Sequence, residues 1–234
     1  MSIAPKTSHI SIIIPTLNAA SRLDAALASV AGVPGVEVVL VDGGSADETV
    51  AIARSYGIRV LEAEPGRAQQ MNAGAAVASG DILLFLHGDT VLPPGFADLV
   101  RETLAGEGVV AGAFRLAFAP ANRALKIIAW GANLRSRWLQ MPYGDQALFM
   151  RRDVFNAVGG FSDMVILEDL VLVKKLKRRG RIVTRPEAIV TSPRRWQQGG
   201  YVRHTLLNQM ILLGFFFNIS LDNLVQWYRA RDQG

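Results

Sequence analysis

The sequence predicts an α/β fold in which helices cover a mostly parallel central sheet. Over the first 115 residues, short β-branched and apolar runs alternate with amphipathic stretches, the rhythm of βαβ units. Half of the 234 residues are hydrophobic and 19% are charged, so the chain can bury a sizeable core. The length suits one large domain.

The apolar runs and the stretches between them predict the elements in order. Strands are expected at 10–14, 36–41, 58–61 and 82–86, with helices between them at 19–30, 47–56 and 68–79. Ser45 is expected to cap the second helix, with Glu48 as its capping-box partner. In the second half we expect a strand at 109–118, a basic amphipathic helix at 121–139, a strand at 146–150, a helix at 167–179 and an apolar helical tail at 197–221.

Charge is divided unevenly along the chain. Residues 1–114 carry a net charge of −6 and residues 115–234 a net charge of +11. A cationic half fits nucleic acid, anionic lipid or a phosphate-bearing substrate. No basic helix interleaves stacking aromatics or matches a helix-turn-helix or zinc-finger pattern, so we expect no nucleic acid partner.

Cysteine is absent from the sequence, which excludes disulfides, thiolate metal sites and cysteine nucleophiles. Any metal must therefore be bound by oxygen or imidazole. The apolar run at 10–14 is too short for a signal peptide and no cleavage pattern follows it. A cytoplasmic location is expected.

Polar segments follow three of the predicted strands. Ligands bind at the carboxyl ends of the strands in an open parallel sheet, where this sequence has Pro15 to Asn18, Asp42 to Ser45 and His87 to Thr90. The first segment contains neither GxGxxG nor GxxxxGK[ST], which excludes the dinucleotide fingerprint and the P-loop. The site therefore needs another chemistry.

Carboxylates at these positions have two readings each. Asp42 suits recognition of a base or ribose, and equally an ordinary Asp-Gly turn. Asp89 can bind Mg²⁺ or Mn²⁺ bridging diphosphate oxygens, or simply end a strand in a turn. Glu168 and Asp169 open a helix, where the dipole favours acids whatever the function, but one of them could serve as general base for an acceptor hydroxyl.

Six sequence blocks follow one another over about residues 10–200: ISIIIPTLN, VVLVDGGSADET, GRAQQMNAGAAVASGDILLFLHGDT, PYGDQALFMRRDVFNAVGGF, LEDLVLVKKLKRRGR and SPRRWQQGG. Taken in this order, they resemble the family 2 glycosyltransferases of the GT-A fold. The sequence is most similar to small bacterial members with a His-x-Asp-Thr metal motif. The resemblance implies a GT-A type, Rossmann-like sheet with a helical C-terminal segment, in one continuous domain whose residues 1–115 bind the nucleotide-sugar and 116–234 the acceptor.

The resemblance also implies an inverting transfer, of a hexosyl group, from a nucleoside-diphosphate sugar to an acceptor hydroxyl with Mn²⁺ or Mg²⁺. The nucleotide-sugar would contact Pro15, Thr16, Asn18, Asp42, Gly44, Arg67, His87 and Asp89. Asp89 would bind the metal. His87 stands where this family has its first motif Asp, and its imidazole can still hydrogen-bond a ribose hydroxyl.

The remaining roles implied by the resemblance lie in the second half. Asp169 would be the general base with Glu168 as its neighbour, although either acid could hold the role. The acceptor or the diphosphate would meet Gly144, Asp145, Gln146, Arg194, Arg195 and Trp196. His204 is a candidate second metal ligand, or a histidine simply packed in its helix.

Two other function classes share this fold. A nucleotidyltransferase needs a Gly-rich loop with Arg and Lys after the first strand, which PTLNAASRL does not provide. A non-catalytic sugar-nucleotide-binding protein would need neither Asp89 nor Asp169.

The basic and apolar segments of the second half predict how the acceptor is reached. Gly214 and Asn218 interrupt the tail, so it lacks the run of about 20 apolar residues that spans a membrane. It suits buried core, homodimer packing or peripheral membrane contact. The helix at 121–139 places four cations, Arg123, Lys126, Arg135 and Arg137, beside Trp130 and Trp138. With the charge of +11, these segments predict a lipidic or amphiphilic acceptor at the inner membrane surface.

Overall fold

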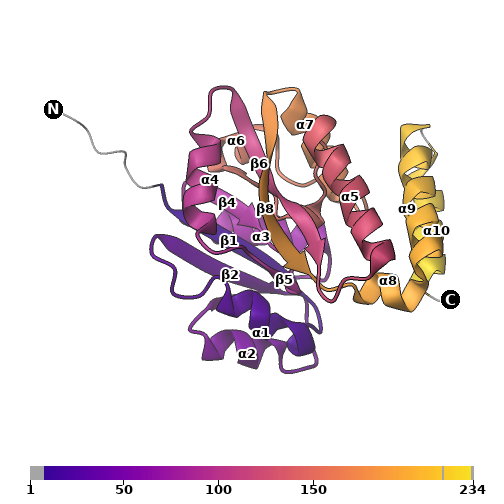
Figure 1. Ribbon diagram of the computed structural model, residues 1–234. Helices are drawn as coiled ribbons and strands as arrows, with labels where there is room; N and C mark the ends of the chain where they lie inside the picture. The colour runs from indigo at the N-terminus through magenta and orange to yellow at the C-terminus, as the bar shows by residue number, and fades with distance from the viewer. Residues whose placement is uncertain (1–7, 218, 233–234) are drawn as a thin grey trace.

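Alternating side chains of the first strand bury both faces of the sheet. Ile10, Ile12 and Ile14 join one hydrophobic cluster, while Ile13 joins a second. Successive strand residues point to opposite faces, so both faces must be covered by helices. The structure is a computed structural model that describes residues 8–217 and 219–232 (Figure 1).

Eight strands form one sheet in the order β3-β2-β1-β4-β7-β6-β8-β5. β1 (Ile10–Thr16), β2 (Val36–Asp42), β3 (Arg59–Glu62) and β4 (Ile82–Phe85) are parallel. β7 (Phe149–Arg151) runs antiparallel between β4 and β6 (Val109–Phe118). β8 (Arg181–Thr191) is parallel to β6, and β5 (Thr90–Val91) pairs antiparallel with it. Strands from both halves of the chain thus share one sheet.

Helices cover the two faces of this sheet. The first cluster includes buried side chains of α1 (Ala20–Ala28), α2 (Thr49–Ser55), α4 (Phe96–Leu104) and α5 (Arg123–Trp138). The second includes those of α3 (Arg67–Val77), α6 (Arg152–Ala157) and α7 (Glu168–Lys177).

The chain ends in three helices, α8 (Arg194–Gly199), α9 (Tyr201–Phe216) and α10 (Leu221–Asp232). Ile211 and Leu224 join Ile166, which lies just before α7 in the chain, in a third, small cluster. Figure 1 shows α9 and α10 side by side, next to α5. Within the described ranges, no helix has the length and apolarity needed to span a membrane.

Two predictions about local structure are wrong. The strand predicted at 146–150 begins at Phe149, because residues 144–146 form a 3₁₀ turn, η1 (Gly144–Gln146), in which the Gln146 side chain accepts the Tyr143 backbone N–H at 3.4 Å. Ser45 does not cap α2, since its N–H and hydroxyl both donate to Asp42. The tail predicted to be helical at 197–221 is largely helical, and its helices α8 and α9 are separated at Gly200, whose φ of +73° is incompatible with a continuing helix.

Several elements lie where the sequence analysis predicts none, namely β5, α4, α6, β8 and most of α10. β8 has no clear strand pattern in the sequence, because it contains charged residues and a proline. The pairing register of β6 with β8 shifts between Phe114 and Arg115 of β6. Pro186 of β8 lies in this irregularity, where no backbone N–H is needed for a hydrogen bond between the strands.

Candidate functional site

The carboxyl ends of β1 and β8 and the segment after β4 meet around one pocket of about 490 Å³. Thr16 ends β1, Asp89 follows β4, and Thr191 ends β8. The pairing of β5 with β8 sets Thr90 opposite Thr191, which brings residues 87–90 to that corner. Such a crevice is the expected ligand site of an α/β sheet.

The pocket gathers many of the residues predicted from sequence. Those that line it are Pro15, Thr16, Arg67, His87, Asp89, Asp145, Asp169, Trp196 and His204. Other predicted residues lie outside the lining, namely Asn18, Asp42, Gly44, Gly144, Gln146, Glu168 and Arg194. The side chain of Arg195 lies outside the described part of the chain.

Asp42 organises the loop after β2. It is 2% exposed, and its oxygens accept the Gly44 N–H at 3.0 Å, the Ser45 N–H at 2.7 Å and the Ser45 hydroxyl at 2.5 Å. Asn18, with φ of +49°, joins this loop to the one after β1, because its amide oxygen accepts the Ala46 N–H at 2.9 Å. The two residues shape adjacent loops at the edge of the pocket.

Gln146 is fully buried and hydrogen-bonds to two neighbouring elements, β6 and α5. Its amide nitrogen donates to the Phe114 carbonyl at 3.0 Å and to the Ser136 hydroxyl at 3.1 Å. This residue therefore fixes η1 against β6 and α5, and it presents its neighbour Asp145 to the pocket.

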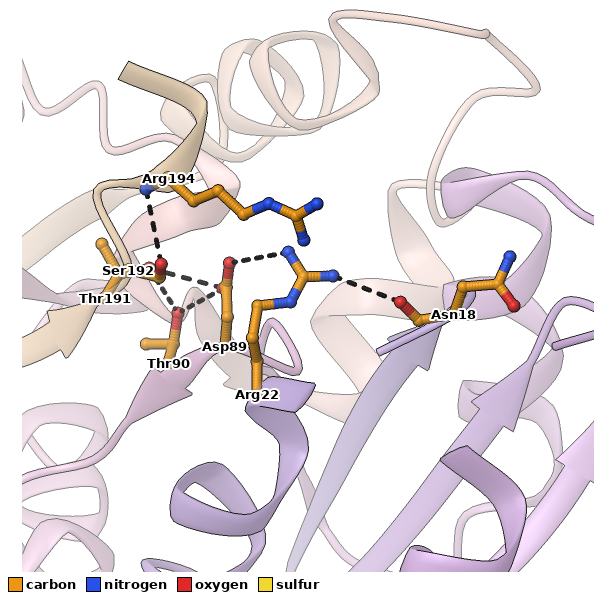
Figure 2. A network of polar contacts seen from close by, with 7 residues as sticks. All are labelled: Asn18, Arg22, Asp89, Thr90, Thr191, Ser192 and Arg194. Atoms are coloured by element: carbon orange, nitrogen blue, oxygen red, sulfur yellow. Dashed lines mark hydrogen bonds and ion pairs between the residues drawn. The ribbon is translucent and has the colours of Figure 1, made fainter. Parts of the chain in front are cut away.

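Asp89 presents a partly exposed carboxylate to the pocket (Figure 2). One oxygen lies 4.0 Å from Nη1 of Arg22, and the other accepts the hydroxyls of Thr90 at 3.3 Å and Thr191 at 3.4 Å. Figure 2 shows the Arg194 side chain extending toward Arg22 and Asp89. Two cations beside a carboxylate suit a ligand with several negative charges.

Arg67 connects the first turn of α3 to the acids of α7. Its Nε lies 2.9 Å from Oε1 of Glu168, and its Nη1 lies 3.5 Å from Nε2 of His87. Burial lowers the pKa of Arg67, but the carboxylates of Glu168 and Asp169 raise it by more, so it lies above its ordinary value. Arg67 therefore stays charged. Glu168 is 1% exposed, and its carboxylate is engaged in the ion pair with Arg67.

Asp169 faces the pocket beside Glu168. Its Oδ2 accepts the Gly144 N–H at 2.6 Å, and its Oδ1 accepts the Leu170 N–H at 2.7 Å. A Cβ added at Gly144 would lie 3.3 Å from Oδ2 of Asp169 and 3.5 Å from Nε2 of His87. Gly144 thus lets η1 approach both side chains closely.

Tyr143 lies between this carboxylate cluster and α5. The guanidinium of Arg135 lies 3.4 Å from its ring centroid. Burial raises the pKa of Tyr143, and Asp169 and Asp145 add to the rise against the opposing effect of Arg135. The hydroxyl oxygen is buried, so the raised pKa keeps the O–H neutral, and the residue lines the pocket.

The C-terminal helices close the opposite wall of the pocket. His204 is 4% exposed, and its ring centroid lies 4.5 Å from that of Trp196. Asn208, Ile211 and Leu212 from α9 and Tyr228 from α10 line the same wall. This side combines aromatic and aliphatic surface with a few polar groups, which suits a partly apolar ligand.

Sequence reasoning missed several residues of the pocket, chiefly Arg22, Gln70, Tyr143, Thr191, Asn208 and Tyr228. Arg22 could have been predicted from the sequence, since it lies in the helix that follows the predicted ligand loop Pro15 to Asn18. Thr191 could not, because β8 itself was not predicted.

The donor set around Asp89 fits a divalent cation that is shared with a ligand. Within the described residues, no three His, Cys, Asp or Glu side chains are grouped so that they could hold a metal ion. Mg²⁺ is commonly held by one or two carboxylates together with substrate phosphates. A single carboxylate at the mouth of the pocket therefore fits a cation that is completed by phosphate oxygens.

Comparison with known proteins agrees with this geometry. The family described as Glycosyl transferase family 2 matches residues 11–162. A PGL/p-HBAD biosynthesis glycosyltransferase from Mycobacterium bovis (strain BCG / Pasteur 1173P2) is 34% identical over 166 residues, 65% of this chain and 62% of that protein. This chain thus spans less than two thirds of the length of that relative.

Solved structures share the fold at lower identity. S. aureus TarS 1-349 in complex with UDP has a TM-score of 0.64 at 20% identity, covering 79% of this chain and 60% of that one. The mannosyltransferase PcManGT from Pyrobaculum calidifontis in complex with GDP-Man and Mn²⁺ has a TM-score of 0.64 at 20% identity, covering 89% and 66%. These likenesses confirm the predicted α/β fold of the GT-A type.

Proposed function

The chain belongs to glycosyl transferase family 2, and on that premise we propose that it transfers a hexosyl group from a nucleoside-diphosphate sugar to an acceptor hydroxyl, with inversion. One observation carries the proposal: Asp89, which follows β4, and Asp169 of α7 line the same pocket, together with the cation Arg67. A non-catalytic sugar-nucleotide-binding protein would have no use for two such acids.

Asp169 is the general base of this proposal. Glu168 is buried and paired with Arg67, whereas Asp169 faces the pocket. The Gly144 N–H occupies one lone pair of Oδ2 and leaves another that can accept the proton of an acceptor hydroxyl. As that oxygen attacks the anomeric carbon, the nucleoside diphosphate leaves from the opposite face, which inverts the configuration.

Asp89 is the carboxylate that would hold Mn²⁺ or Mg²⁺ against the diphosphate. A cation held by Asp89 would supply positive charge to offset the negative charge of the leaving nucleoside diphosphate. Mn²⁺ is named with the fold neighbour PcManGT, which supports this assignment. His204, in the same pocket lining, is the candidate second metal ligand. Arg194 and Arg195 open α8, and we assign them to adding positive charge near the diphosphate.

The remaining predicted residues divide between donor and acceptor. We assign the loops of Pro15, Thr16, Asn18, Asp42 and Gly44, with His87, to the base and ribose, and the segment Gly144, Asp145 and Gln146 with Trp196 to the acceptor side. On this assignment residues 1–115 bind the donor and residues 116–234 the acceptor, within one continuous sheet.

The acceptor is proposed to be lipidic or amphiphilic and to be reached at the inner face of a membrane by a cytoplasmic enzyme. Support comes from the net charge of +11 in residues 115–234 and from the aliphatic and aromatic wall formed by Trp196, Ile211 and Leu212.

A donor panel tests the proposal directly. The protein is incubated with UDP-, GDP- and TDP-sugars in the presence of Mn²⁺, and release of nucleoside diphosphate is measured. We expect release from one donor class, its loss on chelation, and its loss in Asp169→Asn but not in the exposed control Glu107→Gln. Pyrophosphate release instead would favour a nucleotidyltransferase, and binding without release in any acceptor mixture would favour a binding protein.

A further inference from the structure

The outer face of α5 exposes four large apolar side chains. Ile127 is 68% exposed, Trp130 66%, Leu134 43% and Trp138 73%. Their spacing of three, four and four residues places them along a single stripe of the helix. Isolated exposed apolar residues need no explanation, but a contiguous stripe with two tryptophans marks an interaction surface.

Cations flank this stripe, and acids are absent from the helix. Arg123, Lys126 and Arg137 are exposed, and at 100° per residue they fall on the same side as the stripe. The sequence of α5, RALKIIAWGANLRSRW, contains no Asp or Glu. We call these seven residues the α5 face: Arg123, Lys126, Ile127, Trp130, Leu134, Arg137 and Trp138.

The inner side of α5 holds the helix without help from this face. Leu125, Ala129 and Ser136 are buried, and Asn122 caps the helix by accepting the Leu125 N–H at 2.9 Å. Arg135 belongs to the inner side, since its Nε donates to the Met141 carbonyl at 3.0 Å and its guanidinium covers Tyr143. The α5 face can therefore be changed without disturbing the fold.

The neighbouring helix α9 repeats this division. His204 and Ile211 face the pocket, while Val202, Leu206 and Leu213 are more than half exposed on its outer side. α9 contacts α5, and Figure 1 shows the two next to each other. Arg135 of α5 holds Tyr143, which lines the pocket, and α9 supplies other lining residues, so each helix connects an exposed apolar surface to a wall of the pocket.

We propose that the α5 face docks on the surface of an anionic lipid bilayer and sets the acceptor side of the pocket against it. Tryptophan suits the boundary between headgroups and acyl chains, aliphatic side chains enter the acyl region, and Lys and Arg pair with anionic headgroups. Charge argues against a second copy, since two copies docked symmetrically would oppose cation to cation. The aliphatic side chains Ile127 and Leu134 beside the tryptophans suit acyl chains, which nucleic acid does not offer.

Vesicle co-sedimentation of the full chain tests this docking. The probe is vesicles of equal parts phosphatidylcholine and phosphatidylglycerol at low salt, compared with phosphatidylcholine alone. We expect binding to the anionic vesicles only, weakened by high salt. Arg137→Glu should reduce the partition about tenfold or more, and Trp130→Ala/Trp138→Ala should do the same. The control Arg54→Glu, an exposed cation in α2, should leave it unchanged.

Three results would overturn the proposal: no vesicle association by folded protein at low salt, an equal loss in Arg54→Glu, or a partition unchanged by both α5 variants. Self-association or RNA binding that depends on these side chains, without vesicle binding, would assign the face to those partners instead. The inference rests on the proposed function in one respect: docking would bring the pocket to an acceptor at the membrane. Vesicle binding is measured without donor, so its failure and failure of nucleoside diphosphate release are separate results.

Discussion

At the residue scale, two adjacent carboxylates at the start of α7 are held in different environments. Glu168 is buried against Arg67, and Asp169 faces the pocket beside Gly144. We expect Asp169→Asn to bind nucleoside diphosphate normally while transfer falls by about 10² or more, the scale of a lost general base. Titration calorimetry and donor turnover measure the two effects separately, and normal turnover would give the role to Glu168 or Asp145.

The same contrast gives the opposite expectation for Glu168. Replacing Glu168 with Gln removes the negative partner of Arg67 and should lower the free energy of unfolding by about 1–3 kcal/mol, less than for a fully buried pair because Arg67 is 32% exposed. Urea unfolding measures the loss, with Glu107→Gln as the surface control. A stability equal to that of the control would mean that the pair contributes nothing.

At the element scale, α3 is tied to the ends of β1 and β2 by one side chain. Nε2 of Gln70 donates to the carbonyls of Thr16 and Val41, both at 2.8 Å. Gln70→Leu should cost about 1–3 kcal/mol of stability through the two lost hydrogen bonds and should weaken nucleoside diphosphate binding, since these strands end at the pocket. Gln69→Leu, on the exposed side of α3, is the matched control and should change stability by less than about 0.5 kcal/mol.

Glu37 of β2 connects β1 to the turn before β4. It accepts the Ser11 hydroxyl at 2.5 Å and the Ser79 N–H at 2.8 Å. Burial raises the pKa of Glu37, but these hydrogen bonds lower it by more, so it lies below its ordinary value of 4.5. The stabilisation is complete above pH 4.5 and is lost as pH falls through the lower, folded-state pKa. Urea unfolding across this range should show a deficit for Glu37→Gln that shrinks on acidification; a constant deficit would contradict it.

Sequence pattern predicted the elements whose apolar residues form a simple pattern. β1 to β4 and α5 lie within two residues of the expected bounds at each end, because the strands are short apolar runs and the buried residues of α5 repeat with a period of 3.6. β8 could not be found, since Pro186 and its charges are tolerated only through an irregular pairing with β6. Asp89 and Asp169 were found from their places after a strand and at a helix start and from the family resemblance, whereas Tyr143 joins the pocket through tertiary packing alone.

At the scale of the whole molecule, one sheet carries an acidic half and a basic half, and the pocket lies where they meet. Asp89 comes from the acidic half, while Asp169 and the C-terminal wall come from the basic half. The central claim is that this junction binds a nucleoside diphosphate together with a divalent cation. A ligand that binds only the folded state raises its stability by mass action, so binding can be read from thermal unfolding.

Thermal unfolding with and without a nucleoside diphosphate, in Mn²⁺ or in chelator, tests this claim most directly. We predict that UDP or GDP with Mn²⁺ raises Tm more than either alone, and that Asp89→Ala loses the Mn²⁺-dependent part while the surface variant Glu107→Gln keeps it. At a ligand concentration one hundred times Kd, the gain corresponds to about 2.7 kcal/mol. Equal shifts with Mn²⁺ and with chelator in the wild type, or a metal-dependent shift that survives in Asp89→Ala, would contradict the account.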